Sequence, residues 1–394
     1  MQSDDDWQRW RDEWTLPADV TYLNHGSFGP SPRTVQQARQ QWTEQLEQQP
    51  MDFFVRQMES LLDDASQTMG DFVGADGQDL VFVDNSTTAM NIVADSVDLK
   101  ADDEVLLTDH EYGAVIRIWR RVSKQAGANI VVRKLPFPMT SIDETVDAFF
   151  EGVSPRTRLI VVSHITSPTA TILPIQQICD RAKTLGIPVC VDGPHALAML
   201  PLNLRTIGCD YYAVSCHKWL CGPFGSGFLY VRRRHQQSLR PTVMSWGRSV
   251  SGRLACWKDE FEWIGTRDPA AFLATSAAVD FLRTYGCDNF RQQTHELAQY
   301  ARQRIVELTG LESHIPDSPK WYGSMISVPL PESDGPPSKP NEPDPLQLLL
   351  WTKYKIEIPV IHWHGRRFIR VSCHIYNRPA DVDRLVDALR ESLG

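Results

Sequence analysis

Between residues 79 and 215 the sequence repeats a pattern of strand, turn and helix. Short aliphatic and aromatic runs alternate with longer amphipathic segments, which is typical of a mostly parallel sheet covered by helices. The expected strands are Leu80–Val83, Glu104–Leu107, Arg158–Val162, Ile187–Val191 and Tyr211–Val214. Unusual polar clusters follow these strands, at the edge of the sheet where open α/β folds bind ligands. The sequence therefore predicts an α/β protein with a site at the carboxyl ends of its strands.

The composition excludes several classes of partner. The 394 residues are 42% hydrophobic with a formal net charge of -9, so a large core is expected without a strongly basic surface. We expect no nucleic-acid partner, which would need clustered Lys and Arg. We also expect no membrane segment, and the polar start without a secretory signal predicts a cytoplasmic protein. The eight cysteines lack zinc-type spacing, and His362 and His364 lack a nearby third ligand, so reduced thiols and no metal are expected.

The cluster after the last of these strands contains a lone lysine. Ser215-Cys216-His217-Lys218 leaves the strand and continues into Gly222-Pro223. A buried lysine amine near other polar groups has a lowered pKa and can form a Schiff base with a carbonyl compound. The ordinary alternative is a lysine at a strand end whose amine reaches solvent. The other clusters decide between these interpretations.

Those clusters offer chemistry that complements an amine. A helix that opens with Ser86-Thr87-Thr88 suits a phosphate dianion, although Ser and Thr are also common helix caps. Asp192 can keep a pyridine nitrogen protonated or can simply form a turn. Tyr112 can stack on an aromatic ring or pack in the core. Ser215 and His217 alternate on an extended segment and can complete the phosphate site, although His217 also fits a core histidine.

An amine, an acid, an aromatic ring and a phosphate site together describe one cofactor, pyridoxal 5'-phosphate (PLP). The chain resembles the class V, fold type I PLP enzymes, and within them the isopenicillin N epimerase-like branch. Seven blocks occur in the order expected for that branch: Asn24–Pro30, Pro50–Phe53, Thr108–Gly113, Val191–Ala196, Cys216–Leu220, Gly265–Pro269 and Ile369–Ser372. Seven ordered blocks are far more specific than any one of them.

The resemblance assigns expected roles to individual residues. Lys218 would form the Schiff base, Asp192 would pair with the ring nitrogen, and His195 would lie near the ring hydroxyl. Tyr112 would stack on the ring, while Ser167 occupies the position of a cofactor-contacting asparagine in the related cysteine desulfurases. The residues expected to bind the phosphate are Ser86, Thr87, Thr88, Ser215 and His217.

The resemblance also implies how the substrate is bound. Arg370 would bind the carboxylate of an amino-acid substrate, with Asn24 and His25 beside it. Thr266 would reach the phosphate of a partner subunit, which implies a homodimer with shared active sites.

Several reactions of this family start with removal of the Cα proton. The resemblance favours an amino-acid epimerase, with a C-S lyase of the sulfoxide lyase type or a class V aminotransferase as alternatives. A catalytically silent relative is the non-enzyme alternative. A cysteine desulfurase is disfavoured, because residues 353–367 contain no cysteine. An epimerase needs a second acid on the face away from Lys218, for which Tyr112, His25 and a bound water are the candidates.

The resemblance implies a large domain with a mostly parallel seven-stranded sheet flanked by helices, followed by a small α+β domain. We expect an N-terminal arm and helices over residues 1–50, the PLP-binding domain over 51–285, and a linking helix with the small domain over 286–394. The chain departs from the branch at Pro194, at the segment His362-Trp363-His364 and at residues 331–345. The last of these holds six prolines and predicts a solvent-exposed loop.

Overall fold

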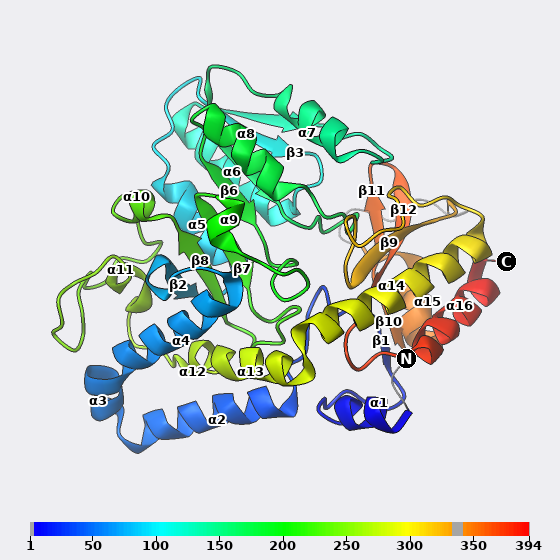
Figure 1. Cartoon of the computed structure of the whole chain (residues 1–394), viewed down its shortest axis with the longest axis horizontal. Coiled ribbons are helices and arrows are strands. Elements are labelled where there is room, and N and C mark those ends of the chain that lie inside the picture. The colour runs from blue at the N-terminus through cyan, green and yellow to red at the C-terminus, as the bar shows by residue number, and fades with distance from the viewer. Residues whose placement is uncertain (1–3, 333–341, 394) are drawn as a thin grey trace.

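A seven-stranded sheet lies at the centre of the larger part of the molecule in the computed structural model, which describes residues 4–332 and 342–393 (Figure 1). Its order is β2-β8-β7-β6-β5-β3-β4, and only β8 runs antiparallel to its neighbours. The strands are β2 (Leu80–Val83), β3 (Glu104–Thr108), β4 (Asn129–Arg133), β5 (Thr157–Ser163), β6 (Val189–Asp192), β7 (Tyr211–Ser215) and β8 (Gly227–Val231). The predicted α/β fold with a mostly parallel seven-stranded sheet is confirmed.

Helices cover both faces of this sheet because its central strands are buried on both sides. Along β5, Leu159 and Val161 pack with α5 and α6, whereas Ile160 and Val162 face the layer that contains α4, α7 and α8. This alternation follows from the two-residue repeat of a strand. The helices of the two layers are α5 (Ser86–Ser96), α6 (Gly113–Ala126), α4 (Met58–Val73), α7 (Ile142–Phe150) and α8 (Ile175–Thr184).

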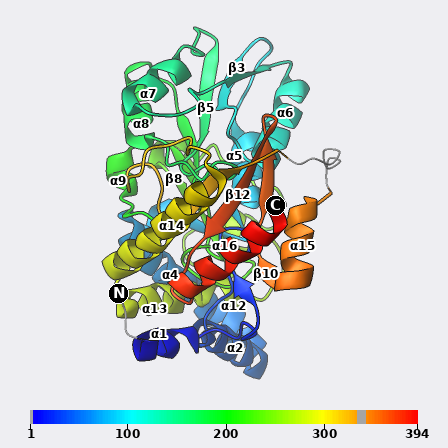
Figure 2. The same cartoon turned by 90° about the vertical axis from the view of Figure 1, so that its right-hand side faces the viewer.

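The smaller part is an antiparallel sheet with helices on one side (Figure 2). Its strand order is β11-β12-β9, and α14 packs against β9 and α16. A separate pair joins β1 near the N-terminus to β10 in parallel. These elements are β1 (Thr21–Tyr22), β9 (Met325–Leu330), β10 (Ile356–Glu357), β11 (Val360–Trp363), β12 (Arg366–Ser372), α14 (Cys287–Thr309), α15 (Pro345–Tyr354) and α16 (Pro379–Leu393).

Shorter elements and the first helices complete the chain. They are α1 (Asp4–Arg11), α2 (Arg33–Gln48), α3 (Pro50–Asp52), α9 (Leu204–Ile207), α10 (Arg233–Gln236), α11 (Asp259–Glu262), α12 (Ala270–Leu273) and α13 (Thr275–Tyr285). Residues 333–341, most of the predicted proline-rich loop, lie outside the described residues. Within the described ranges we find no helix with the length and apolar character needed to cross a bilayer. All eight cysteines are free in the structure.

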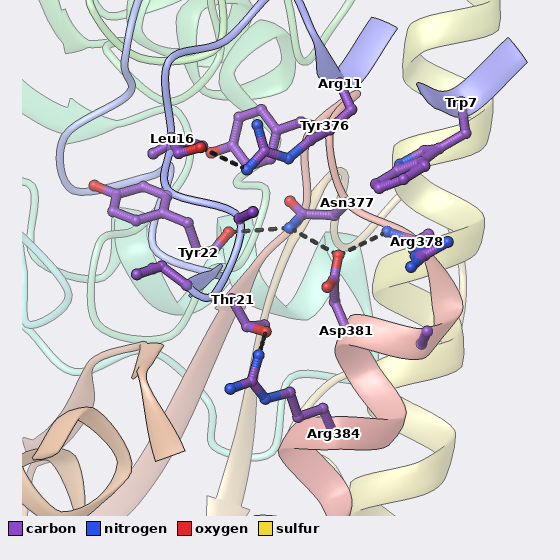
Figure 3. Close-up of a pocket in the computed structure, with 13 residues that line it drawn as sticks. Trp7, Arg11, Leu16, Thr21, Tyr22, Tyr376, Asn377, Arg378, Asp381 and Arg384 are labelled. Atoms are coloured by element: carbon purple, nitrogen blue, oxygen red, sulfur yellow. Dashed lines mark hydrogen bonds between the residues drawn. The ribbon is translucent and has the colours of Figure 1, made fainter. Parts of the chain in front are cut away.

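The N-terminal arm is fastened to the small part by polar contacts around a cavity of about 220 Å³ (Figure 3). Arg384 Nη1 on α16 donates to Thr21 Oγ1 at 3.1 Å, whereas Arg11 Nη2 donates within the arm to the Leu16 carbonyl at 2.9 Å. Asn377 Nδ2 donates to the Tyr22 carbonyl at 3.0 Å. Because the arm continues directly into residues 24–30, these contacts help to fix the loop that reaches the strand ends.

That loop lies against the turn that carries the predicted lysine. The Gly29 N–H donates to the His217 carbonyl at 3.1 Å, and a Cβ on Gly29 would lie 2.4 Å from His25 Nε2 and 2.6 Å from that same carbonyl oxygen. Real Cβ atoms are essentially never found under 3.0 Å from such atoms. Only glycine therefore allows the loop to approach this closely.

We expect Gly29→Ala to lower the melting temperature by about 2–4 °C or more, because the added methyl group must displace packed backbone. Gly113→Ala is the matched control, since a Cβ there meets nothing within 4 Å. Thermal unfolding followed by fluorescence compares the two variants. Equal melting temperatures would contradict the close approach described above.

Candidate active site

The predicted site residues gather around a cavity of about 620 Å³ at the carboxyl ends of β5, β6 and β7. The strand register explains this convergence, because Ser163 on β5 pairs with Asp192 on β6, and Asp192 pairs with Ala213 on β7. The predicted residues that line the cavity are Ser86, Thr87, Thr88, Tyr112, Ser167, Asp192, His195, Ser215, His217, Lys218 and Arg370. Asn24, His25 and Thr266 are not among them.

The Lys218 side chain is half-buried, and protonation of its amine is disfavoured. Its Nζ lies 3.0 Å from His195 Nε2, and burial together with the nearby Arg370 charge lowers the pKa of Lys218 to about 7, against the opposing effect of Asp192. Trp219 Nε1 donates to His195 Nδ1 at 3.4 Å, which places the proton of neutral His195 on Nε2. That nitrogen can then donate to the unprotonated Lys218 amine. The arrangement holds the amine in its nucleophilic form.

Asp192 is a buried carboxyl without a protein partner for its side chain. No hydrogen bond or ion pair reaches its carboxyl oxygens in residues 4–332 and 342–393, although only 6% of the residue is exposed. Burial raises the pKa of Asp192 to about 6, and the charge of Lys218 opposes this rise. A buried carboxylate normally needs a cation or N–H donor, so the cavity beside it fits a protonated ring nitrogen.

The start of α5 forms a pocket for an anion. Asn85 caps the helix by accepting a hydrogen bond from the Thr88 N–H at 3.0 Å, and the Ser86 N–H donates to Ser215 Oγ at 2.9 Å. Ser215 and Ser86 place their hydroxyl oxygens 3.1 Å apart. His217 Nδ1 is buried without a partner in the described part of the chain. Helix N–H groups, hydroxyls and an unpaired imidazole nitrogen fit a phosphate group.

Arg370 on β12 brings a buried cation from the small part to the cavity. Its Nη1 donates to the carbonyl and hydroxyl oxygens of Ser167 at 2.8 and 3.1 Å, and its Nη2 donates to Ser27 Oγ at 2.7 Å. No carboxylate pairs with it among the described residues, and its Nε has no partner. Burial lowers the pKa of Arg370 to about 10. Such a guanidinium fits a carboxylate ligand.

Asn24 and His25 lie behind the lysine turn. His25 is fully buried, with Nδ1 2.8 Å from the Tyr376 hydroxyl and Nε2 2.9 Å from the Lys218 carbonyl. Burial lowers the pKa of His25 to about 3. Asn24 Nδ2 donates to Glu357 at 3.1 Å. His25 therefore supports the turn that carries Lys218 and is too enclosed to serve as the second acid of an epimerase, whereas Asn24 contacts β10 and β12.

Thr266 is exposed and does not line the cavity of its own chain, so its predicted role across a subunit boundary stays a prediction. Trp363 packs on the ring of His110, with centroids 4.3 Å apart. His362 Nε2 lies 2.7 Å from Asp344, and His364 Nε2 lies 3.6 Å from Asp109. Each histidine therefore has its own carboxylate, and the pair does not converge on one point.

One group in the described residues brings potential metal ligands together, namely His25, Cys221 and His374. Their ligand atoms lie within 4.8 Å of one another. The two imidazoles are stacked, however, with centroids 4.0 Å apart and an interplanar angle of 18°. Nearly parallel rings direct their lone pairs side by side, whereas metal ligands must converge. We assign this cluster to packing behind Lys218.

Sequence reasoning did not identify three residues of the site. Ser27 binds Arg370, Ser163 lines the cavity beside Asp192, and Glu111 lies directly behind Ser163. Ser27 and Glu111 fall within two of the recognised blocks, which was the available signal. Their contacts depend on strand packing that the sequence does not show.

Comparison with known proteins places this site in a family. Residues 21–385 match the family described as Aminotransferase class-V. The chain belongs to this family. Membership confirms the predicted class V enzyme and its dependence on PLP, and one solved relative holds glycine covalently linked to that cofactor.

Similar class V proteins include two epimerases. The chain is 36% identical over 400 residues to isopenicillin N epimerase of Amycolatopsis lactamdurans and 35% identical over 396 residues to that of Streptomyces clavuligerus, with 98% of each chain covered. It is 29% identical to a probable chloroplastic L-cysteine desulfhydrase of Arabidopsis thaliana, covering 94% of this chain and 82% of the relative. The predicted resemblance to the epimerase-like branch is confirmed.

Solved structures share the fold. The cystine C-S lyase C-DES in complex with cysteine persulfide superposes with a TM-score of 0.79 at 21% identity, covering 95% of this chain and 98% of that one. The cysteine desulfurase CsdA of Escherichia coli gives a TM-score of 0.78 at 22% identity, covering 98% of both chains.

We expect Lys218 in the cofactor-free protein to react with fluorodinitrobenzene along a titration curve centred near pH 7, where burial places its pKa. The neutral amine reacts, so labelling rises with pH. Asp192→Asn should move the midpoint to lower pH because Asp192 favours the charged amine, and Arg370→Gln should move it to higher pH because Arg370 disfavours it. Peptide mass mapping follows the label. A midpoint near that of exposed lysines in all three proteins would contradict the described electrostatics.

Proposed function

We propose that this chain is a PLP-dependent epimerase that inverts the Cα of an amino-acid substrate. The observation that carries this proposal is the full-length similarity to two isopenicillin N epimerases, which exceeds the similarity to the desulfhydrases. When bound, PLP supplies an aldehyde for Lys218 and a protonated ring that accepts electron density from Cα. The site residues supply binding, orientation and proton transfer.

The proposed roles follow from the contacts in the cavity. Arg370 binds the substrate carboxylate, since it is a buried cation without a carboxylate partner. Lys218, with its lowered pKa, removes and returns the Cα proton on one face. Asp192 holds the ring nitrogen in its protonated form, and His195 orients the amine. The cluster at the start of α5 holds the phosphate, through Ser86, Thr87, Thr88, Ser215 and His217.

Inversion also needs a proton donor on a second face, and Tyr112 is the side chain that supports this role. It lines the cavity, is 52% exposed and lies at the start of α6, on a different element from Lys218. Tyr112 and Arg370, the proposed binding residue for the substrate carboxylate, line the same cavity, which supports this role. We propose that Tyr112 stacks on the cofactor ring and donates the second proton.

We expect wild-type protein to convert isopenicillin N to its epimer in deuterated water with deuterium at the inverted carbon. Tyr112→Phe keeps an aromatic ring but removes the proton, so epimer formation should fall about 100-fold or more while exchange of the Cα hydrogen with retained configuration continues. Chiral chromatography with mass spectrometry measures both. Unchanged inversion in Tyr112→Phe would remove its acid role.

A C-S lyase is the second candidate because desulfhydrases of 28–29% identity cover at least 94% of this chain. The same assay with L-cysteine as the substrate distinguishes an epimerase from a C-S lyase. Release of pyruvate and sulfide without any inverted product would favour the lyase. A desulfurase is disfavoured because no cysteine in residues 4–332 and 342–393 lines the cavity.

We propose that the enzyme is a homodimer with shared sites in the cytoplasm. Exposed apolar side chains on the segment 243–254 support a protein interface, with Met244 80%, Trp246 61% and Leu254 94% exposed. Thr266, also exposed, follows the same segment and is available to a partner's phosphate site. The eight free thiols fit a reducing compartment.

Leu254→Asp should weaken the dimer by about tenfold or more, because a charge would be buried at the contact. Sedimentation should give twice the 44.7 kDa chain mass for wild type and a monomer fraction for the variant. Leu185→Asp is the matched control, since Leu185 is also exposed, at 53%, but follows α8. A monomeric wild type, or equal effects of both variants, would contradict this interface.

A further inference from the structure

A second carboxyl group is buried behind the wall of the cavity. Glu111 is 5% exposed, and its two carboxyl oxygens accept hydrogen bonds from Thr108 Oγ1 and Ser163 Oγ, each at 2.6 Å. Neither an arginine nor a lysine pairs with it in the described part of the chain. The proposed mechanism gives this carboxyl no role.

Ser163 connects Glu111 to the site. It lines the cavity and is the register partner of Asp192 on the neighbouring strand. A serine hydroxyl has one proton, and here that proton is donated to Glu111. The Ser163 oxygen can therefore only accept hydrogen bonds from the cavity. Together with the Asp192 carboxylate it forms a wall of acceptors.

This wall of hydrogen-bond acceptors favours a ligand atom that can donate a hydrogen bond. A protonated ring nitrogen carries an N–H and suits this wall, whereas an unprotonated nitrogen is itself an acceptor and would face unpaired lone pairs. A negative charge on Glu111 also favours a protonated ring nitrogen, because Glu111 lies close enough to Asp192 for the two carboxyls to interact. Cys190 on β6 also faces this pair, and Lys218 faces Asp192 from the turn that follows β7.

We propose that Glu111 is a positioning residue for the ring-nitrogen end of the cofactor, acting through the Ser163 hydroxyl and through the charge it places beside Asp192. This inference rests on the proposed PLP-dependent function. It adds a buried relay, Glu111 to Ser163, that keeps the nitrogen end of the site selective for the protonated ring. Burial and Asp192 raise the pKa of Glu111 to about 7, while the bonds from Ser163 and Thr108 favour its charged form.

Binding of PLP and of its 1-deaza analogue, in which carbon replaces the ring nitrogen, tests the relay without measuring catalysis. Both compounds carry the same aldehyde and phosphate, but only PLP has the nitrogen. The full-length protein is stripped of cofactor and titrated with each compound, and absorbance reports binding. Glu111→Gln can donate from its amide to Ser163 and turn that hydroxyl toward the cavity as a donor.

We expect Glu111→Gln to weaken PLP binding by about tenfold while changing binding of the analogue less than about twofold. The ring nitrogen of bound PLP should also lose its proton at lower pH than in wild type, which the pH dependence of the cofactor absorbance reports. Glu104→Gln is the matched control. Glu104, on β3, is another buried carboxyl that is bound by Arg156 and Ser154 and does not line the cavity.

If Glu111→Gln weakened the binding of PLP and of the 1-deaza analogue equally, the inference would be overturned and Glu111 would have a purely structural role. If that variant does not fold, Ser163→Ala provides the same comparison, with the same selective loss expected. Failure of wild-type protein to bind PLP at Lys218 would instead refute the proposed function, so the two failures are distinguishable.

Discussion

The structure depends on bringing two opposite charges out of water at the ends of neighbouring strands. Lys218 follows β7 and is half-buried, Asp192 ends β6 and is buried, and both line the same cavity. Burial alone disfavours both charges, which lowers the pKa of the amine and raises that of the carboxyl. The attraction between the two charges partly offsets both pKa shifts. The pair is therefore poised between neutral and charged forms near neutral pH, which is what a reactive amine and a ring-nitrogen partner require.

Three parts of the chain contribute the residues of this site. The sheet delivers the amine and the acid, the start of α5 delivers an anion pocket, and the small part delivers Arg370 through β12. The N-terminal loop joins these parts, because Ser27 binds Arg370 and Gly29 binds the backbone beside Lys218. The contact between Ser27 and Arg370, which are 343 residues apart, thus helps to fix where a substrate carboxylate would lie relative to the amine.

Much of this could be predicted from the sequence, for identifiable reasons. The strand β2 coincides with its expected range, and β3 and β7 extend one residue beyond theirs, because fully buried strands appear in the sequence as apolar runs. The site residues at strand ends were predictable because parallel strands share one ligand edge. The strands β4, β10 and β11 were not predicted, since they are short or half-exposed. His25 was expected at the substrate, whereas Tyr376 and the Lys218 carbonyl enclose it through packing that sequence spacing does not reveal.

Reduction of the PLP-loaded protein with borohydride, followed by peptide mass mapping, shows directly whether Lys218 carries the cofactor. The account predicts one phosphopyridoxyl group per chain, attached to Lys218. The same label on a different lysine, or no covalent label after loading, would contradict it.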